Sequence, residues 1–193
     1  VFLFTVCLHH FLGSDLERIY DELGKRFPEI CFVRCFMDPI MRKSGLTPDQ
    51  KLRLSMYDPL KKGPVTEEGQ RRISILGSDF ALDETSDLKR LLRCNDYQIK
   101  ESPVCESWED YLSLSDCRMM LNCYPSGKAG TEWAAERLER PFMYLPSCFD
   151  YDEIIGQLEA LSESLELLGV LDYEGEKESC EAALHEALLE VGD

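Results

Sequence analysis

Arg118-Met-Met-Leu-Asn-Cys123-Tyr-Pro-Ser126 is an apolar run that stops at a cysteine and continues into a loop. Its apolar part, 119–122, predicts a buried strand, and Ala129–Leu138 behind it has the pattern of a helix. Ligands of open α/β sheets bind outside the carboxyl ends of the strands. The sequence therefore predicts that Cys123 lies at a candidate functional edge.

A second run of the same kind opens the chain. Val1-Phe-Leu-Phe-Thr-Val-Cys7 predicts a buried strand and again ends on a cysteine. A thiolate at a strand end is placed for metal or redox chemistry, so Cys7 and Cys123 are the candidate metal ligands. The alternative is that both are buried core thiols, because cysteine is among the residues most often found inside proteins.

Strands and helices alternate outward from these two runs, which predicts parallel sheets with helices on both faces. The fold class expected is α/β, with Rossmann-like parallel sheets flanked by helices. Further strands are predicted over 31–36, 73–76, 97–100 and 142–145. Helices are predicted from the capping boxes at Ser14–Glu17 and Thr47–Gln50, and over 86–93, 108–114, 129–138, 151–168 and 177–191.

The segment 61–69 has the composition of a linker, with two glycines, a proline and charges but no apolar periodicity. We expect 1–62 to be the C-terminal part of a first Rossmann-like domain and 63–70 to be the linker. The second Rossmann-like domain then covers 71–168, and 169–193 forms an acidic helical tail. Because Val1 already lies inside a strand-like run, the chain is expected to be a fragment of a longer one.

Composition narrows the classes of function. The net charge of −16 over 193 residues argues against nucleic acid as a partner. No apolar run approaches the ~20 residues of a membrane span. Nine cysteines without regular spacing are typical of reduced thiols, so we expect a cytoplasmic protein. The acidic residues concentrate after Tyr151, which favours a solvated helical end.

Two familiar phosphate motifs are absent. Gly77-Ser-Asp79 follows a strand without G-x-G-x-x-G, and Ser126-Gly127-Lys128 lacks both the earlier glycine and the hydroxyl residue that a phosphate loop requires. Gly127 and Gly130 open a helix whose N–H groups suit an anion or an anionic cluster. A plain strand-to-helix turn is the alternative.

The other reactive side chains give weaker signals. Cys31 and Cys35 fall on one predicted strand, facing the same way, and core packing explains them better than a zinc site. His9 and His10 are adjacent, so at most one faces a site with Cys7. The few histidines provide no Ser-His-Asp or Cys-His arrangement, and hydrolysis has no support.

Several short motifs, in order and with consistent spacing, resemble the nitrogenase component 1 family. Thr5-Val-Cys7 followed by Gly13-Ser-Asp15-Leu16 is similar to that family's Thr-x-Cys and Gly-Asp-Asp-Leu. Ile73–Phe80 resembles its strand with Gly-Asp-Tyr-Asn, and Leu121–Ser126 resembles the Cys-Tyr-Arg-Ser of its α subunit. The similarity covers most of 1–168; the residues after it match nothing in the family.

The resemblance implies a Rossmann-like fold repeated along the subunit and an oxidoreductase that binds an iron–sulfur or related metal cluster. It makes Cys7 a ligand of the bridging cluster and Cys123 the cysteine that holds one end of the metal cofactor. Tyr124, Ser126 and Gly127 would then lie against that cofactor. The implied partners are a second nitrogenase-like subunit and an ATP-dependent iron–sulfur reductase.

Two departures from the family keep the substrate open. Pro125 stands where the family has a cationic arginine, and neither the upstream cysteines nor the later histidine ligand are present in this sequence. Two alternatives remain beside an enzyme subunit. One is a non-catalytic scaffold for cofactor assembly, and the other is an α/β binding module without metal.

Overall fold

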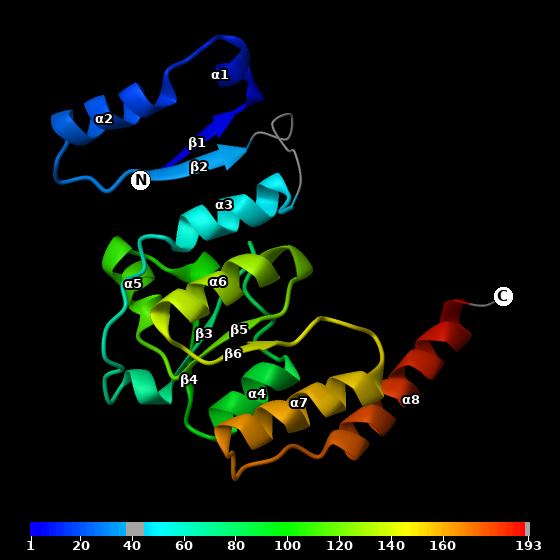
Figure 1. Ribbon diagram of the computed structural model, residues 1–193. Coiled ribbons are helices and arrows are strands. Elements are labelled where there is room, and N and C mark those ends of the chain that lie inside the picture. The colour runs from blue at the N-terminus through cyan, green and yellow to red at the C-terminus, as the bar shows by residue number, and fades with distance from the viewer. Residues whose placement is uncertain (38–44, 192–193) are drawn as a thin grey trace. The chain divides into compact units, whose positions relative to one another are not determined.

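The computed structural model describes residues 1–37 and 45–191 (Figure 1), so the predicted break at Asp38-Pro39 lies outside the described residues. The chain divides into two compact units. The first comprises 1–81 and 99–146, and the second comprises 82–98 and 147–193. The predicted boundary at 63–70 stays a prediction.

The first unit contains a small parallel sheet of β1 (Phe2–Val6) and β2 (Val33–Met37), in register from Phe2 opposite Val33. The short helix α1 (Cys7–Phe11) follows β1 directly, and α2 (Leu16–Arg26) leads to β2. Tyr20 of α2 donates a hydrogen bond to the carbonyl of Leu3 and packs edge-on against Phe36, which fixes α2 to the sheet.

A second sheet in the same unit has four strands in the order β4-β3-β5-β6. β5 pairs in parallel with β3 on one side and with β6 on the other. All residues of β3 and β5 are buried, as expected for central strands. The strands are β3 (Arg72–Ile75), β4 (Gln98–Glu101), β5 (Met119–Asn122) and β6 (Phe142–Tyr144).

The strand order reverses direction between β3 and β5. After β3 the chain moves outward to β4, and it then returns to the other side of β3 to form β5 and β6. In open α/β sheets, the point where the strand order reverses is where a crevice forms at the carboxyl ends. The loops after β3 and β5 therefore flank the position at which this fold class binds ligands.

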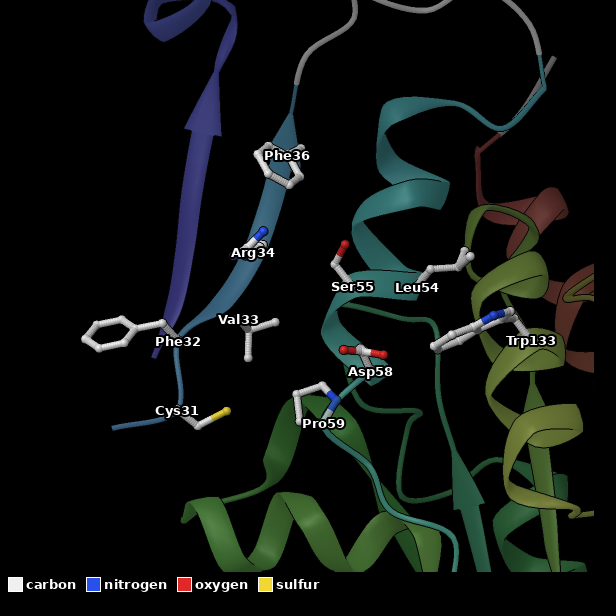
Figure 2. Close-up of a pocket in the computed structure, with 10 residues that line it drawn as sticks. All are labelled: Cys31, Phe32, Val33, Arg34, Phe36, Leu54, Ser55, Asp58, Pro59 and Trp133. Atoms are coloured by element: carbon white, nitrogen blue, oxygen red, sulfur yellow. The ribbon is translucent and has the colours of Figure 1, made fainter. Parts of the chain in front are cut away.

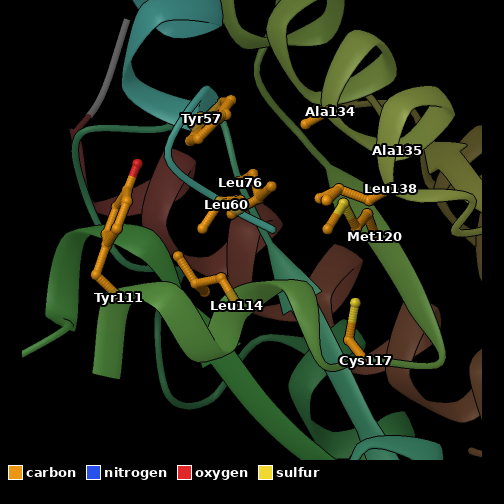
Figure 3. Packing of buried hydrophobic residues seen from close by; sticks show 10 residues of the cluster. All are labelled: Tyr57, Leu60, Leu76, Tyr111, Leu114, Cys117, Met120, Ala134, Ala135 and Leu138. Carbon is orange, nitrogen blue, oxygen red and sulfur yellow. The ribbon is translucent and has the colours of Figure 1, made fainter. Parts of the chain in front are cut away.

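Three helices of the first unit surround an apolar cluster on one side of this sheet (Figure 3). They are α3 (Pro48–Tyr57), α5 (Trp108–Leu112) and α6 (Lys128–Leu138). Leu76 and Met120 contribute to the cluster from the sheet side. Ten buried residues form it: Tyr57, Leu60, Leu76, Tyr111, Leu114, Cys117, Met120, Ala134, Ala135 and Leu138. Phe2 of β1 packs edge-on against Tyr111, which joins the small sheet to this core.

The second unit is helical. It contains α4 (Asp87–Cys94), α7 (Tyr151–Leu165) and α8 (Tyr173–Val191). The Asn95 amide donates to the carbonyl of Gly169 and accepts from its N–H, so the end of α4 is fastened to the turn between α7 and α8. α8 has no buried residue, and its solvent-exposed, acidic character agrees with the sequence.

The α/β fold class is confirmed, and several boundaries need correction. The strand predicted over 31–36 begins at Val33. Cys31 therefore precedes the strand and is exposed, whereas Cys35 lies within it and is buried. Core packing is thus confirmed for Cys35 and wrong for Cys31. The helix predicted from Ser14 has Asp15 as its N-cap. The strand predicted to Cys7 ends at Val6.

The long helix predicted to residue 168 stops at Leu165, where Glu166 adopts a left-handed conformation. The final helix begins earlier than predicted, at Tyr173 rather than Lys177. Within the described residues, no helix has both the length and the apolar character needed to cross a membrane.

We predict that Gly127→Ala destabilises the first unit by about 3 kcal/mol, because overpacking a rigid contact is costly. An added Cβ would lie 2.2 Å from the carbonyl oxygen and 2.3 Å from the Cα of Gly77. Urea unfolding measures the effect. The control is Gly24→Ala in α2, which meets no atom within 4 Å and should gain about 0.5–1 kcal/mol. Equal stability of the two variants would contradict the close approach.

Candidate functional site

The candidate site is the carboxyl edge of β3 and β5, where the two following loops touch backbone to backbone. Gly77, with φ of +89°, leaves β3 against Gly127. Only glycine tolerates both this positive φ and the contact, since a Cβ on either residue would meet the other's backbone within 3 Å. The two glycines thus fix the spacing of the loops.

Buried hydrogen bonds fasten this contact from both sides. The Asn122 side-chain amide donates to the carbonyl of Leu76 at 2.8 Å, and the Gly77 N–H donates to the Tyr57 hydroxyl at 2.6 Å. Thr131 donates to the carbonyl of Gly127 at 3.0 Å. The Asn122 Oδ1 atom is buried without a hydrogen-bond partner among the described residues, so the edge retains an acceptor that a donor would stabilise.

Cys123 follows β5 immediately and is 8% exposed. Burial raises the pKa of its thiol to about 11, and the carboxylate of Glu101 on the edge strand β4 adds to the rise. The thiol is therefore protonated at neutral pH. A metal that bound the sulfur would have to displace this proton, because the thiolate is the ligand.

Tyr124, Ser126 and Gly127 form the loop between Cys123 and α6. Pro125–Gly127 is a single 3-10 turn that runs straight into α6, and the N–H of Gly127 bonds back to the carbonyl of Tyr124 at 3.0 Å. The open, positive end of the helical segment therefore shifts back toward Cys123. Tyr124 is 53% exposed and Gly127 is buried, so the tyrosine faces solvent while the glycine lies in the packed interior.

Two cations border the edge. Lys128, the first residue of α6, places its ammonium over the Tyr144 ring at 4.8 Å. Arg53 of α3 has a side chain only 4% exposed and forms two 2.7 Å hydrogen bonds to Asp79, in the loop after β3. The Arg53 guanidinium lowers the pKa of Asp79. The Lys128 ammonium thus lies over β6, and the Arg53 guanidinium is paired with the loop after β3.

Cys7 lies in a different setting. It is partly buried at the start of α1, after a strand of the two-stranded sheet, whereas Cys123 follows a strand of the four-stranded sheet. His9 receives a 3.2 Å hydrogen bond from the Val6 N–H at its Nδ1 atom, so its ring is engaged by its own backbone. Within residues 1–37 and 45–191, no three ligating side chains gather as a metal site.

Sequence reasoning found the glycine-bordered loop and Cys123 but missed the residues that hold them. In the sequence, Asp79 stands out only as part of Gly77-Ser-Asp79. Its partner Arg53 is 26 positions away, and no periodicity links the two. Tyr57 follows the helix start predicted at Thr47, and nothing in the sequence marks its hydroxyl as the partner of the Gly77 N–H. These contacts arise from tertiary packing and have no local signature.

Comparison of the chain with protein-family models and with curated proteins gave no match. The resemblance to nitrogenase component 1 proteins therefore stays a prediction.

We predict that Cys123 resists alkylation in the native chain. Iodoacetamide reacts with thiolates, and the raised pKa and burial leave few of them at Cys123 near pH 8. Mass spectrometry should find Cys31, Cys94 and Cys180, which are exposed, modified long before it. The rate at Cys123 should rise about tenfold per pH unit up to pH 11 while the fold persists. Modification of Cys123 as fast as Cys180 would refute its burial.

We predict that Asp79→Asn lowers the free energy of unfolding by about 1 kcal/mol at pH 7, because it weakens the pairing of a buried guanidinium with a carboxylate that is 65% exposed and therefore screened by water. The folded pKa of Asp79 is depressed, so its stabilisation exists above the unfolded pKa and disappears as pH falls through the folded value. The stability difference from the unmodified chain should therefore shrink below about pH 4. A difference independent of pH would rule out the ionic contribution.

Proposed function

We propose that this chain is part of a nitrogenase component 1-like oxidoreductase subunit that binds an iron–sulfur or related metal cluster. The observation that carries the proposal is Cys123, a thiol at the carboxyl end of β5, where the strand order reverses. Thiolates are the usual ligands of such clusters, and this end of an α/β sheet is the usual binding position. The substrate is left open.

Two charged features of the surroundings act on an anionic group at Cys123 in opposite directions. The carboxylate of Glu101 opposes negative charge at the sulfur, and the open end of the α6 helical segment favours negative charge at this edge. Arg53 does not add to this, since its guanidinium is already neutralised by Asp79. Burial around the sulfur excludes water, which is one means by which proteins tune cluster potentials.

Within the part of the chain that the structure describes, the number of metal ligands near Cys123 is too small to hold a cluster alone. Cys123 provides one sulfur, and the described residues gather no three ligands around it. The residues fit one end of a cluster and not a complete cage, so the proposal requires further ligands from outside the described residues. A bound cluster would supply electron-transfer chemistry. Cys123 would anchor it, and the Gly77–Gly127 contact would hold the anchoring loop in position.

A second candidate, an α/β binding module without metal, is favoured by a specific observation. The pKa of the Cys123 thiol is raised to about 11, as expected for a core cysteine rather than for a thiol prepared as a ligand. The two candidates differ in metal content. Electrons in the first would come from a partner reductase, which is implied only by the family resemblance.

The test compares Cys123→Ala with Cys117→Ala in the full-length gene product, purified without oxygen. Cys117 precedes the same strand, is fully buried, and also has a thiol pKa raised by burial, so both variants remove one core sulfur. We expect Cys123→Ala to lose most bound iron and acid-labile sulfide while Cys117→Ala keeps them. Circular dichroism checks the fold of both.

Unchanged iron in Cys123→Ala would contradict the ligand assignment. Absence of iron from the unmodified, folded protein would favour the binding module instead.

A further inference from the structure

A groove of about 400 Å³ runs along β2 in the first unit (Figure 2). Its volume falls within the range of ligand sites. The strand contributes residues of both faces in succession, including Val33 and Arg34, so the groove follows the edge of the strand and not one face of the sheet. The opposite wall comes from α3 and the residues after it, with Trp133 of α6 beyond.

The backbone of β2 shows what this edge presents. The N–H of Val33 donates to the carbonyl of Val1 at 2.8 Å, and Cys31 accepts from the amino group of Val1, so these groups point toward β1. Backbone groups alternate in direction along a strand. The N–H and C=O groups of Arg34 and Phe36 therefore point to the other edge, which no strand pairs among residues 1–37 and 45–191.

The walls of the groove are largely apolar beside this row of backbone groups. Leu54 and Pro59 line it from the α3 side, and Trp133 extends the surface. Phe36 stands on the strand, 38% exposed. An added strand would thus find hydrogen-bonding partners along β2 and an apolar surface for its side chains, which is how extended peptides bind sheet edges.

The charges of the groove are not equally available. Arg34 forms an ion pair with Glu17 and lies over the Tyr20 ring at 4.7 Å, so its charge is already matched. Asp58 is exposed and enters none of the ion pairs within the described part of the chain. It lies at the C-terminal cap of α3, where the helix dipole is negative. Arg137 bonds to the backbone carbonyl of Asp58 and not to its carboxylate.

We propose that the edge of β2 binds an extended polypeptide segment of a partner, which adds a strand beside β2. The segment would carry apolar side chains at alternate positions and a lysine or arginine opposite Asp58. The unpaired backbone of Arg34 and Phe36 selects an extended chain, and the carboxylate of Asp58 selects its charge. This binding is independent of metal at Cys123.

The test uses two synthetic probes, acetyl-Thr-Val-Thr-Val-Thr-Lys-Thr-Val-Thr-amide, in which Lys and Val share one face of the strand, and the same peptide with Glu for Lys. Amide hydrogen exchange of the chain is followed by NMR at about 1 mM peptide, a weak-affinity range. We expect the Lys peptide to slow exchange at Arg34 and Phe36 roughly tenfold and to bind several-fold more tightly than the Glu peptide. A Lys peptide N-methylated at alternate residues should give no protection.

Charge-reversal variants test the role of Asp58. Asp58→Lys should reverse the preference between the two peptides. The matched control Asp21→Lys, at an exposed carboxylate of α2 away from the groove, should leave it unchanged. The proposal is overturned if neither peptide protects Arg34 and Phe36, if the N-methylated peptide protects them equally, or if Asp58→Lys leaves the preference as it was.

Discussion

The contact between Gly77 and Gly127 is the constraint on which the candidate site depends. Two loops that follow neighbouring strands meet backbone to backbone, closer than any side chain would permit. Asn122 and Tyr57 then satisfy the buried polar groups that this approach creates. As a result Cys123, the next residue after Asn122, has a fixed position at the point where the strand order reverses. The chemistry of the edge follows from this packing.

The elements predicted correctly from the sequence are those whose bounds are set by neighbouring residues. The strand Met119–Asn122 has its predicted bounds, and α6 begins one residue before the prediction, because burial and helical periodicity are local properties. Thr47 caps α3 through the predicted box with Gln50. Cys31 was wrongly assigned to the strand that begins at Val33, because the neighbours of Cys31 are also apolar. The helix α1 was not predicted, because five residues are too few to show a helical periodicity.

The rest of the site depends on residues far apart in the chain. Nothing in the sequence pairs Arg53 with Asp79 or the Tyr57 hydroxyl with Gly77, since tertiary packing alone brings them together. The electrostatic setting of Cys123 was also beyond sequence reasoning. Burial and the Glu101 carboxylate raise the pKa of this thiol, while the open end of the α6 helical segment favours negative charge at the same edge. Metal binding at Cys123 would need the second effect to outweigh the first.

An anomalous-scattering map recorded at the iron absorption edge, from crystals of the full-length gene product grown without oxygen, shows directly whether Cys123 is a metal ligand. We expect an iron peak within bonding distance of the Cys123 sulfur, at the carboxyl end of β5. Iron bound elsewhere, or a well-ordered protein with no iron peak at this edge, would contradict it.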